Sequence, residues 1–108
     1  MKITCPIYYA DIYIYIGVKY SVCVDDLKRR KITNDYDIKE TEDGVCLRLS
    51  DGNVVIWTKK KNIFVIAHEC LHATQHILER SGIYLGNETR EVYAYYHEWL
   101  FKKCMGVK

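Results

Sequence analysis

The hydrophobic pattern of this 108-residue chain changes its period once, near residue 60, and that change limits what the chain can fold into. Before it, residues 7–16 alternate as in a half-buried strand. One side of that strand carries Ile12, Ile14 and Ile16, and the other carries Asp11, Tyr13 and Tyr15. Residues 45–50 alternate too, and 54–58 form the returning strand of a hairpin. Its turn is Asp51-Gly52-Asn53, where glycine accepts a positive φ.

Beyond residue 60 the apolar period becomes helical. Asn62 can cap a first helix that Gly82 ends, and Asn87 can cap a second that runs to about Cys104. The apolar stripe of the first helix is Ile63, Ile66, Ala67, Cys70, Leu71, Thr74, Ile77 and Leu78. The second helix carries Val92, Tyr95, Tyr96, Trp99, Leu100 and Phe101. A small antiparallel or mixed sheet followed by two helices predicts an α+β fold.

The length fits one domain, and we assign residues 1–108 to it. Residues 1–58 are mainly sheet, 62–81 the first helix and 87–104 the second. Residues 21–30 carry mixed signals that fit a short helix after a second strand, and the polar residues 33–44 predict a loop. Tyrosines of the N-terminal half either pack a sheet face or present a surface to a partner, and we favour packing. They are Tyr8, Tyr9, Tyr13 and Tyr15.

Composition excludes several classes. Hydrophobic residues make up 49% and charged residues 28%, which argues against disorder. The net charge of +2 predicts neither a nucleic-acid nor a membrane surface, and no apolar run approaches the roughly 20 residues of a membrane span. The N-terminus lacks the apolar core of a signal peptide. The five cysteines form no C-x-x-C pair, so the sequence predicts a reducing cytoplasm rather than a disulfide framework.

The first C-terminal helix carries His68-Glu69-Cys70-Leu71-His72, an H-E-x-x-H motif. At about 100° per residue the two histidines lie roughly 40° apart and one turn along the helix, so both imidazoles can reach one ion. Neutral imidazole is a good zinc ligand. Glu69 projects beside the ion, where it can take a proton from metal-bound water and return it to a leaving group. Both histidines face away from the apolar stripe, which favours a metal site over core histidines.

A catalytic zinc needs a third protein ligand and an open position. Glu91 is the preferred candidate, because a chain reversal over residues 82–87 lets the second helix lie alongside the first. Tyr95 follows one turn later on the same face, where its hydroxyl could donate to a developing oxyanion. The main rival is Glu88, only about 60° from Glu91 round the helix.

Four further side chains are possible ligands. His76 lies one turn beyond His72 on the same helix but about 80° round the helix axis from His68. This angle favours a hydrogen bond to a ligand, or a surface position, over direct binding of the ion. His97 and Glu98 are predicted to be solvated. Cys70 lies on the apolar face, which favours a buried, inert thiol.

The stretch Ile66-Ala67-His68-Glu69-Cys70-Leu71-His72-Ala73, followed by Glu91-x-x-Ala94-Tyr95, resembles zincin metallopeptidases of the gluzincin type. Small H-E-x-x-H proteins of bacteriophages and prophages are the nearest likeness, which covers residues 54–101. It implies a minimal zincin-like domain with zinc held by His68, His72 and Glu91, and Glu69 as general base. In zincins the strand before the active helix often holds an extended substrate by strand addition. Residues 54–58 would be that edge here.

A weaker likeness is to ImmA/IrrE-type regulatory metallopeptidases, through His68-Glu69-x-x-His72-Ala73-x-x-His76. The chain lacks the further domain and longer segments that usually accompany that motif. It also lacks the third histidine and the Met-turn of metzincins.

These features predict a cytoplasmic, zinc-dependent hydrolase, a metallopeptidase acting on a peptide or protein substrate with Zn²⁺ as cofactor. If the chain is phage-encoded, the compartment is the host cytoplasm. An alternative is a catalytically idle zincin-like protein that binds or inhibits a host protein through its cleft or sheet edge. A third possibility is a structural zinc, closed by His76 or Glu88 as a fourth ligand.

Overall fold

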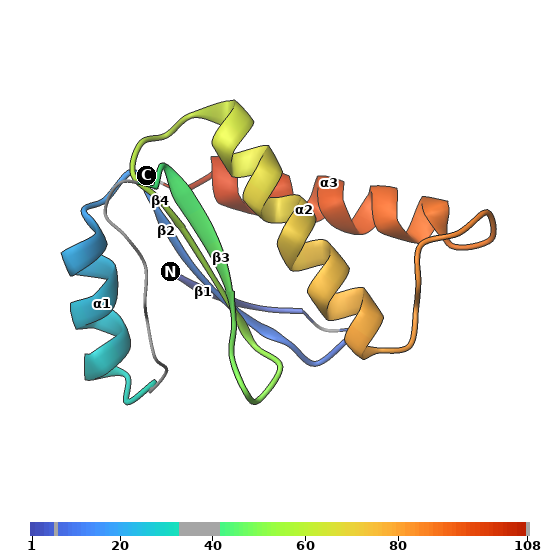
Figure 1. Cartoon of the computed structure of the whole chain (residues 1–108), viewed down its shortest axis with the longest axis horizontal. Coiled ribbons are helices and arrows are strands. Elements are labelled where there is room, and N and C mark those ends of the chain that lie inside the picture. Colours follow the sequence, from blue (N-terminus) through green and yellow to red (C-terminus); the bar gives the residue numbers. More distant parts are fainter. Residues whose placement is uncertain (6, 33–41, 108) are drawn as a thin grey trace.

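A four-stranded mixed sheet lies between α1 on one face and the two C-terminal helices on the other (Figure 1). We describe it from a computed structural model, over residues 1–5, 7–32 and 42–107. The strands are β1 (Lys2–Thr4), β2 (Asp11–Ile16), β3 (Gly44–Arg48) and β4 (Val54–Thr58). The helices are α1 (Tyr20–Arg29), α2 (Ile63–Arg80) and α3 (Arg90–Met105). The predicted α+β class, with the sheet first and two helices after it, is confirmed.

The strand order is β1-β2-β4-β3, with β2 and β4 parallel and the two outer pairings antiparallel. Placing residues 54–58 at the sheet edge was wrong, because β4 is a central strand and β3 lies outside it. All five residues of β4 are buried, as is typical of a strand covered on both faces. The parallel pairing needs a long crossover, and no local pattern in the sequence indicates it.

The predicted alternation of β2 is confirmed, but both sides of the strand are buried, so the sheet separates two cores. The isoleucine side faces α2 and α3 together with Val54 and Ile56. Tyr13 and Tyr15 pack on the opposite face with Val55, Trp57 and α1. The strand begins at Asp11 rather than at Ile7. Tyr8 packs against the first core, whereas Tyr9 is 91% exposed, so the tyrosines are mainly but not all packing residues.

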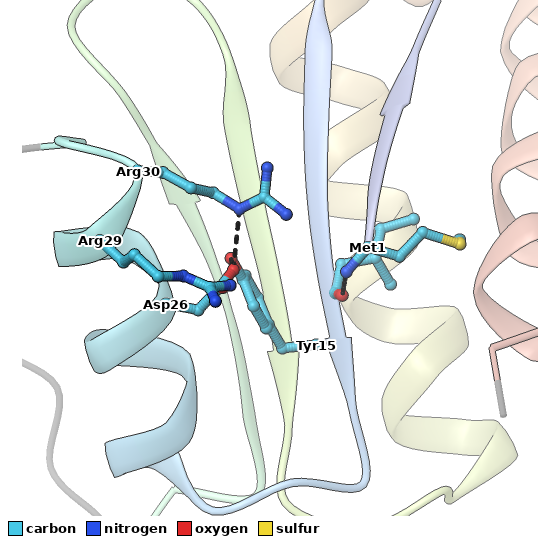
Figure 2. Close-up of polar contacts among 6 residues, drawn as sticks. Met1, Tyr15, Asp26, Arg29 and Arg30 are labelled. Carbon is cyan, nitrogen blue, oxygen red and sulfur yellow. Dashed lines mark hydrogen bonds and ion pairs between the residues drawn. The ribbon is translucent and has the colours of Figure 1, made fainter.

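The predicted short helix is α1, which follows β2 directly with no second strand between them. Its Asp26 carboxylate accepts a hydrogen bond from the Tyr15 hydroxyl at 2.5 Å and pairs with both Arg29 and Arg30 (Figure 2). These contacts fasten α1 to the sheet. Next to Tyr15 along β2, the Ile14 carbonyl accepts a hydrogen bond from the Met1 amino group at 2.8 Å (Figure 2).

The predicted hairpin is formed by β3 and β4. Gly52 has φ +91 in its turn, and Leu49 N–H donates to the Asn53 carbonyl at 2.8 Å. Most of the predicted loop over 33–44 lies outside the described residues, and Gly44 at its end is already the first residue of β3.

The first C-terminal helix, α2, begins and ends as predicted. The Asn62 side chain accepts hydrogen bonds from the backbone N–H groups of Phe64 and Val65, and Gly82 follows the helix with φ +81. Three residues of the predicted stripe are not core residues, because Ile63 is 50% and Leu71 46% exposed and Ala67 is only partly buried. The buried face is Ile66, Glu69, Cys70, Ala73, Thr74, Ile77 and Leu78, rotated towards β3.

The second C-terminal helix, α3, begins two residues later than predicted. Its N-cap is Thr89 rather than Asn87, and the Thr89 hydroxyl bridges the backbone of the preceding loop at Tyr84 and Gly86. The buried face of α3 is Tyr93, Tyr96, Leu100 and Cys104. Val92 and Tyr95, which the sequence placed on the apolar face, are exposed.

Candidate metal centre

The H-E-x-x-H motif lies in the middle of α2, and one turn of that helix brings its three chemical groups together. A ligand atom from each of His68, Glu69 and His72 lies within 4.8 Å of the other two. The Nε2 atoms of the two histidines are 3.2 Å apart, and Nε2 of His68 is 3.9 Å from Oε1 of Glu69. Two nitrogens bound to one tetrahedral zinc at about 2.1 Å would lie roughly 3.4 Å apart. The imidazole pair therefore has the spacing that a shared zinc ion requires.

The two histidines are exposed, whereas the glutamate between them is buried. The His68 side chain is 69% exposed and that of Glu69 is 7% exposed. The predicted outward face of the histidines is thus confirmed. The Glu69 methylene lies against Gly44 at the start of β3, so its carboxylate is on the protein side of the exposed His68.

One oxygen of the Glu69 carboxylate has no hydrogen-bond partner among the described residues. Within the described ranges, its Oε2 atom is buried and receives no hydrogen bond. Burial raises the pKa of the Glu69 carboxyl above its usual value, although His68 and His72 partly oppose that rise. A buried carboxylate without a donor is costly, and a cation or a proton beside it removes the cost. This unpaired oxygen is the observation that fits a metal ion held at the motif.

An open cleft of about 330 Å³ adjoins the motif. It is lined by Asp43, Gly44, Phe64, Val65, His68 and Glu69. A larger cavity of about 440 Å³ lies at the carboxyl ends of β2 and β4, and its lining includes Lys19, Lys59 and Lys60. That larger cavity has no carboxylate, histidine or cysteine in its lining, whereas the cleft beside the motif has His68 and Glu69 at its wall.

The structure does not bring the predicted third ligand into this group. Glu91 is exposed in the first turn of α3, and Glu88 is exposed in the loop before it. Figure 1 shows the start of α3 projecting beyond α2, at the end of the loop that joins the two helices. Tyr95 is 67% exposed and lines a separate, mainly apolar groove with Ile7.

The four other side chains considered as ligands each have different surroundings. Nε2 of His97 is 3.1 Å from the Ala67 carbonyl oxygen, so the prediction that His97 is solvated was wrong: α3 crosses α2 there. Glu98 pairs with Lys102 at the surface. His76 is half-buried beside His72, with ring centroids 6.4 Å apart, and burial lowers its pKa. Cys70 is fully buried as predicted, and its hydrogen bond to Cys104, together with burial, raises the pKa of its thiol.

Sequence reasoning missed the residues that wall the cleft opposite the histidines. Gly44, which begins β3, lies against the turn of α2 that holds Val65 and Glu69. A glycine directly before the strand predicted over residues 45–50 was the available signal. It could be interpreted only once the edge position of β3 beside α2 was known.

Comparison with known proteins gives no relative. No protein-family model, curated protein or solved structure matches this chain. Along the described part of the chain, no helix is both long and apolar enough to cross a membrane.

Proposed function

We propose that this protein is a zinc-dependent hydrolase that cleaves peptide bonds. The observation that supports it best is the pairing of two imidazole nitrogens 3.2 Å apart with a buried carboxylate that has an unpaired oxygen. A structural role for Glu69 alone would be expected to give that oxygen a hydrogen-bond donor. The resemblance of the motif to zincin metallopeptidases agrees with this proposal.

Each group of the motif has one task in the proposed reaction. His68 and His72 hold the ion, which when bound lowers the pKa of water and polarises a carbonyl. Glu69 accepts a proton from the attacking water and passes it to the leaving amine. Its raised pKa suits that exchange, because a carboxylate with a higher pKa is a stronger base towards water.

The cleft beside the motif is our candidate for the substrate site. Glu69 and His68 form one wall, and Gly44 with Asp43 forms the other. An extended peptide placed there would lie along β3, which is an outer strand of the described sheet. We propose Glu91 as the third ligand and Tyr95 as the oxyanion donor on the resemblance. Because both lie outside the motif group, their participation requires the start of α3 to approach α2.

All five cysteines are free thiols, which supports the proposed location in a reducing cytoplasm. Cys70 and Cys104 lie with their Sγ atoms 3.5 Å apart without a bond between them.

Metal content per chain tests the proposal directly. We expect about one zinc per chain in the wild type, and none in His72→Ala, because a single imidazole with no partner holds zinc poorly. His97→Ala is the matched control, since it removes an imidazole from α3 that is outside the group. Elemental analysis after gel filtration gives the stoichiometry, and circular dichroism verifies that each variant is folded.

The same measurement on Glu91→Ala and Glu88→Ala identifies the third ligand. Loss of zinc in Glu91→Ala but not in Glu88→Ala would support Glu91. A wild-type protein that takes up no zinc, even from excess, would refute the hydrolase and favour the alternative of an idle binding protein.

A further inference from the structure

Gly44 lies against the side chains of Val65 and Glu69 on the motif turn of α2. A Cβ atom built on Gly44 would lie 2.7 Å from Cγ1 of Val65 and 3.3 Å from Cγ of Glu69. It would also lie 3.1 Å from the carbonyl oxygen of Trp57. Real Cβ atoms essentially never approach a neighbour within 3.0 Å, so any larger residue at position 44 must displace something.

Glycine is required here for space and not for an unusual conformation. The glycines with positive φ are Gly17, Gly52 and Gly82, and Gly44 is not among them. Gly44 is paired with Thr58 on β4, and Lys59 N–H donates to the Asp43 carbonyl at 2.8 Å, so the ladder holds the backbone on both sides. The Trp57 carbonyl belongs to a central, buried strand. β3 therefore cannot easily move away from α2.

The displacement caused by a larger residue would fall on α2. Val65 is β-branched and has one strongly preferred rotamer in a helix, so its Cγ1 cannot easily turn away. The Glu69 side chain is more flexible, and no described residue donates a hydrogen bond to its buried Oε2 that would resist a shift. Packing of its Cγ methylene against Gly44 is thus a main restraint on where the carboxylate points.

We propose that Gly44 is a positioning residue for Glu69. Its missing side chain lets β3 lie against the Glu69 methylene and directs the carboxylate to the two histidines. This inference rests on the proposed function for its chemical meaning, because the carboxylate that Gly44 places is the proposed proton shuttle.

The test compares Gly44→Ala with Gly86→Ala. A Cβ on Gly86 would meet only the Thr89 hydroxyl oxygen at 4.0 Å, so it adds the same methyl group without a clash. Co²⁺ replaces zinc as the probe, since its visible absorption reports the groups around it. We expect Gly44→Ala to bind Co²⁺ with wild-type stoichiometry, because His68 and His72 are unchanged. Its absorption band should shift in the direction seen in Glu69→Gln, while Gly86→Ala keeps the wild-type band.

A metal-free readout makes the test independent of zinc. The ¹³C resonance of the Glu69 carboxyl, assigned by its absence in Glu69→Gln, should move in Gly44→Ala and stay in place in Gly86→Ala. A wild-type protein that binds no Co²⁺ would refute the proposed function, yet this resonance would still decide whether Gly44 positions Glu69. An unmoved resonance in folded Gly44→Ala, with a wild-type Co²⁺ band, would overturn the inference.

A second pair of variants covers the possibility that Gly44→Ala does not fold. Val65→Ala removes the atom 2.7 Å from the new Cβ and leaves the 3.3 Å contact with Glu69. We therefore expect Val65→Ala/Gly44→Ala to fold and its Glu69 resonance to differ from that of Val65→Ala alone. Identical resonances in this pair would overturn the inference as well.

Discussion

Asp26 and Glu69 are carboxylates on helices that pack against opposite faces of one sheet, and their surroundings push their pKa values in opposite directions. Hydrogen bonds from Tyr15 and Arg30 hold the pKa of Asp26 well below its usual value (Figure 2). Burial raises that of Glu69, whose Oε2 receives no hydrogen bond within the described residues. Partners, and not residue type, decide the sign of the shift.

The comparison separates a carboxylate that stabilises the fold from one that is kept reactive. The Asp26 carboxylate accepts hydrogen bonds from Tyr15 on β2 and from Arg30 at the end of α1, so it joins a helix to the sheet. Glu69 has the opposite arrangement, in which burial without a donor leaves it ready to interact with an ion or a proton. The carboxylate whose oxygens accept hydrogen bonds, Asp26, is therefore the structural one. Glu69, whose Oε2 receives no hydrogen bond from a described residue, is the candidate for chemistry.

The largest expected effect of this difference is on turnover. Glu69→Gln should lower kcat/KM on a mixture of fluorogenic peptides by about 10²–10⁴-fold, because proton transfer by a positioned side chain contributes that much. Zinc content should stay at the wild-type level. Asp26→Asn should leave kcat/KM unchanged, since Asp26 packs with α1 on the other face of the sheet. Wild-type turnover in Glu69→Gln would contradict the assignment of Glu69 as the base.

The next effect is on stability, and it concerns the other carboxylate. Asp26→Asn should lower the free energy of unfolding by about 1–2 kcal/mol at pH 7, because it weakens hydrogen bonds made to a charged acceptor. Urea denaturation measures this change. Asp25→Asn, at an exposed neighbour on the same helix, is the matched control and should have little effect.

The stability difference between the wild type and Asp26→Asn should also depend on pH. Since the folded-state pKa of Asp26 is depressed below the unfolded value of 3.8, its contribution is present above that value and is lost as the pH falls through the folded pKa. The wild type should therefore lose part of its advantage over Asp26→Asn on acidification below about pH 4. An advantage that is constant from pH 7 to pH 2.5 would show that the carboxylate charge is not its source.

The sequence predicted the elements well where their patterns are local. The alternation of β2, the hairpin of β3 and β4, and the Asn62 cap of α2 each depend on residues close together in the chain. The motif histidines belong to this class, because one turn of helix is enough to bring His68 and His72 together. That part of the candidate site could be predicted without knowing the fold.

The errors that affect the candidate site concern contacts between distant segments. The parallel pairing of β2 with β4 moved residues 54–58 to the sheet centre, and the crossing of α3 over α2 brought His97 rather than Glu91 to the motif helix. The role of Gly44 depends on an edge strand reaching the side of α2, which a single sequence does not encode at any fixed spacing. Such placements are set by packing between elements, so they could not be predicted from the sequence alone.

The smallest expected effect is the stability change from removing the Glu69 charge, and its sign is opposite to that at Asp26. A carboxyl whose folded-state pKa is raised contributes stability below the unfolded value of 4.5, and this contribution is lost as the pH rises through the folded pKa. As the pH rises through the folded-state pKa, the metal-free wild type acquires a buried charge that Glu69→Gln lacks. We expect that variant to be more stable by roughly 1 kcal/mol, judged from the cost of burying a polar group without a partner.

Urea denaturation of the metal-free proteins at pH 7 and pH 4 distinguishes this effect from a general gain in packing. The advantage of Glu69→Gln should shrink at pH 4, where the wild-type carboxyl is largely protonated and as neutral as the amide. Zinc should reverse the order at pH 7, because an ion at the motif compensates the carboxylate and not the amide. A metal-free Glu69→Gln less stable than the wild type at pH 7 would mean that Glu69 has a partner and belongs with Asp26 among the structural carboxylates.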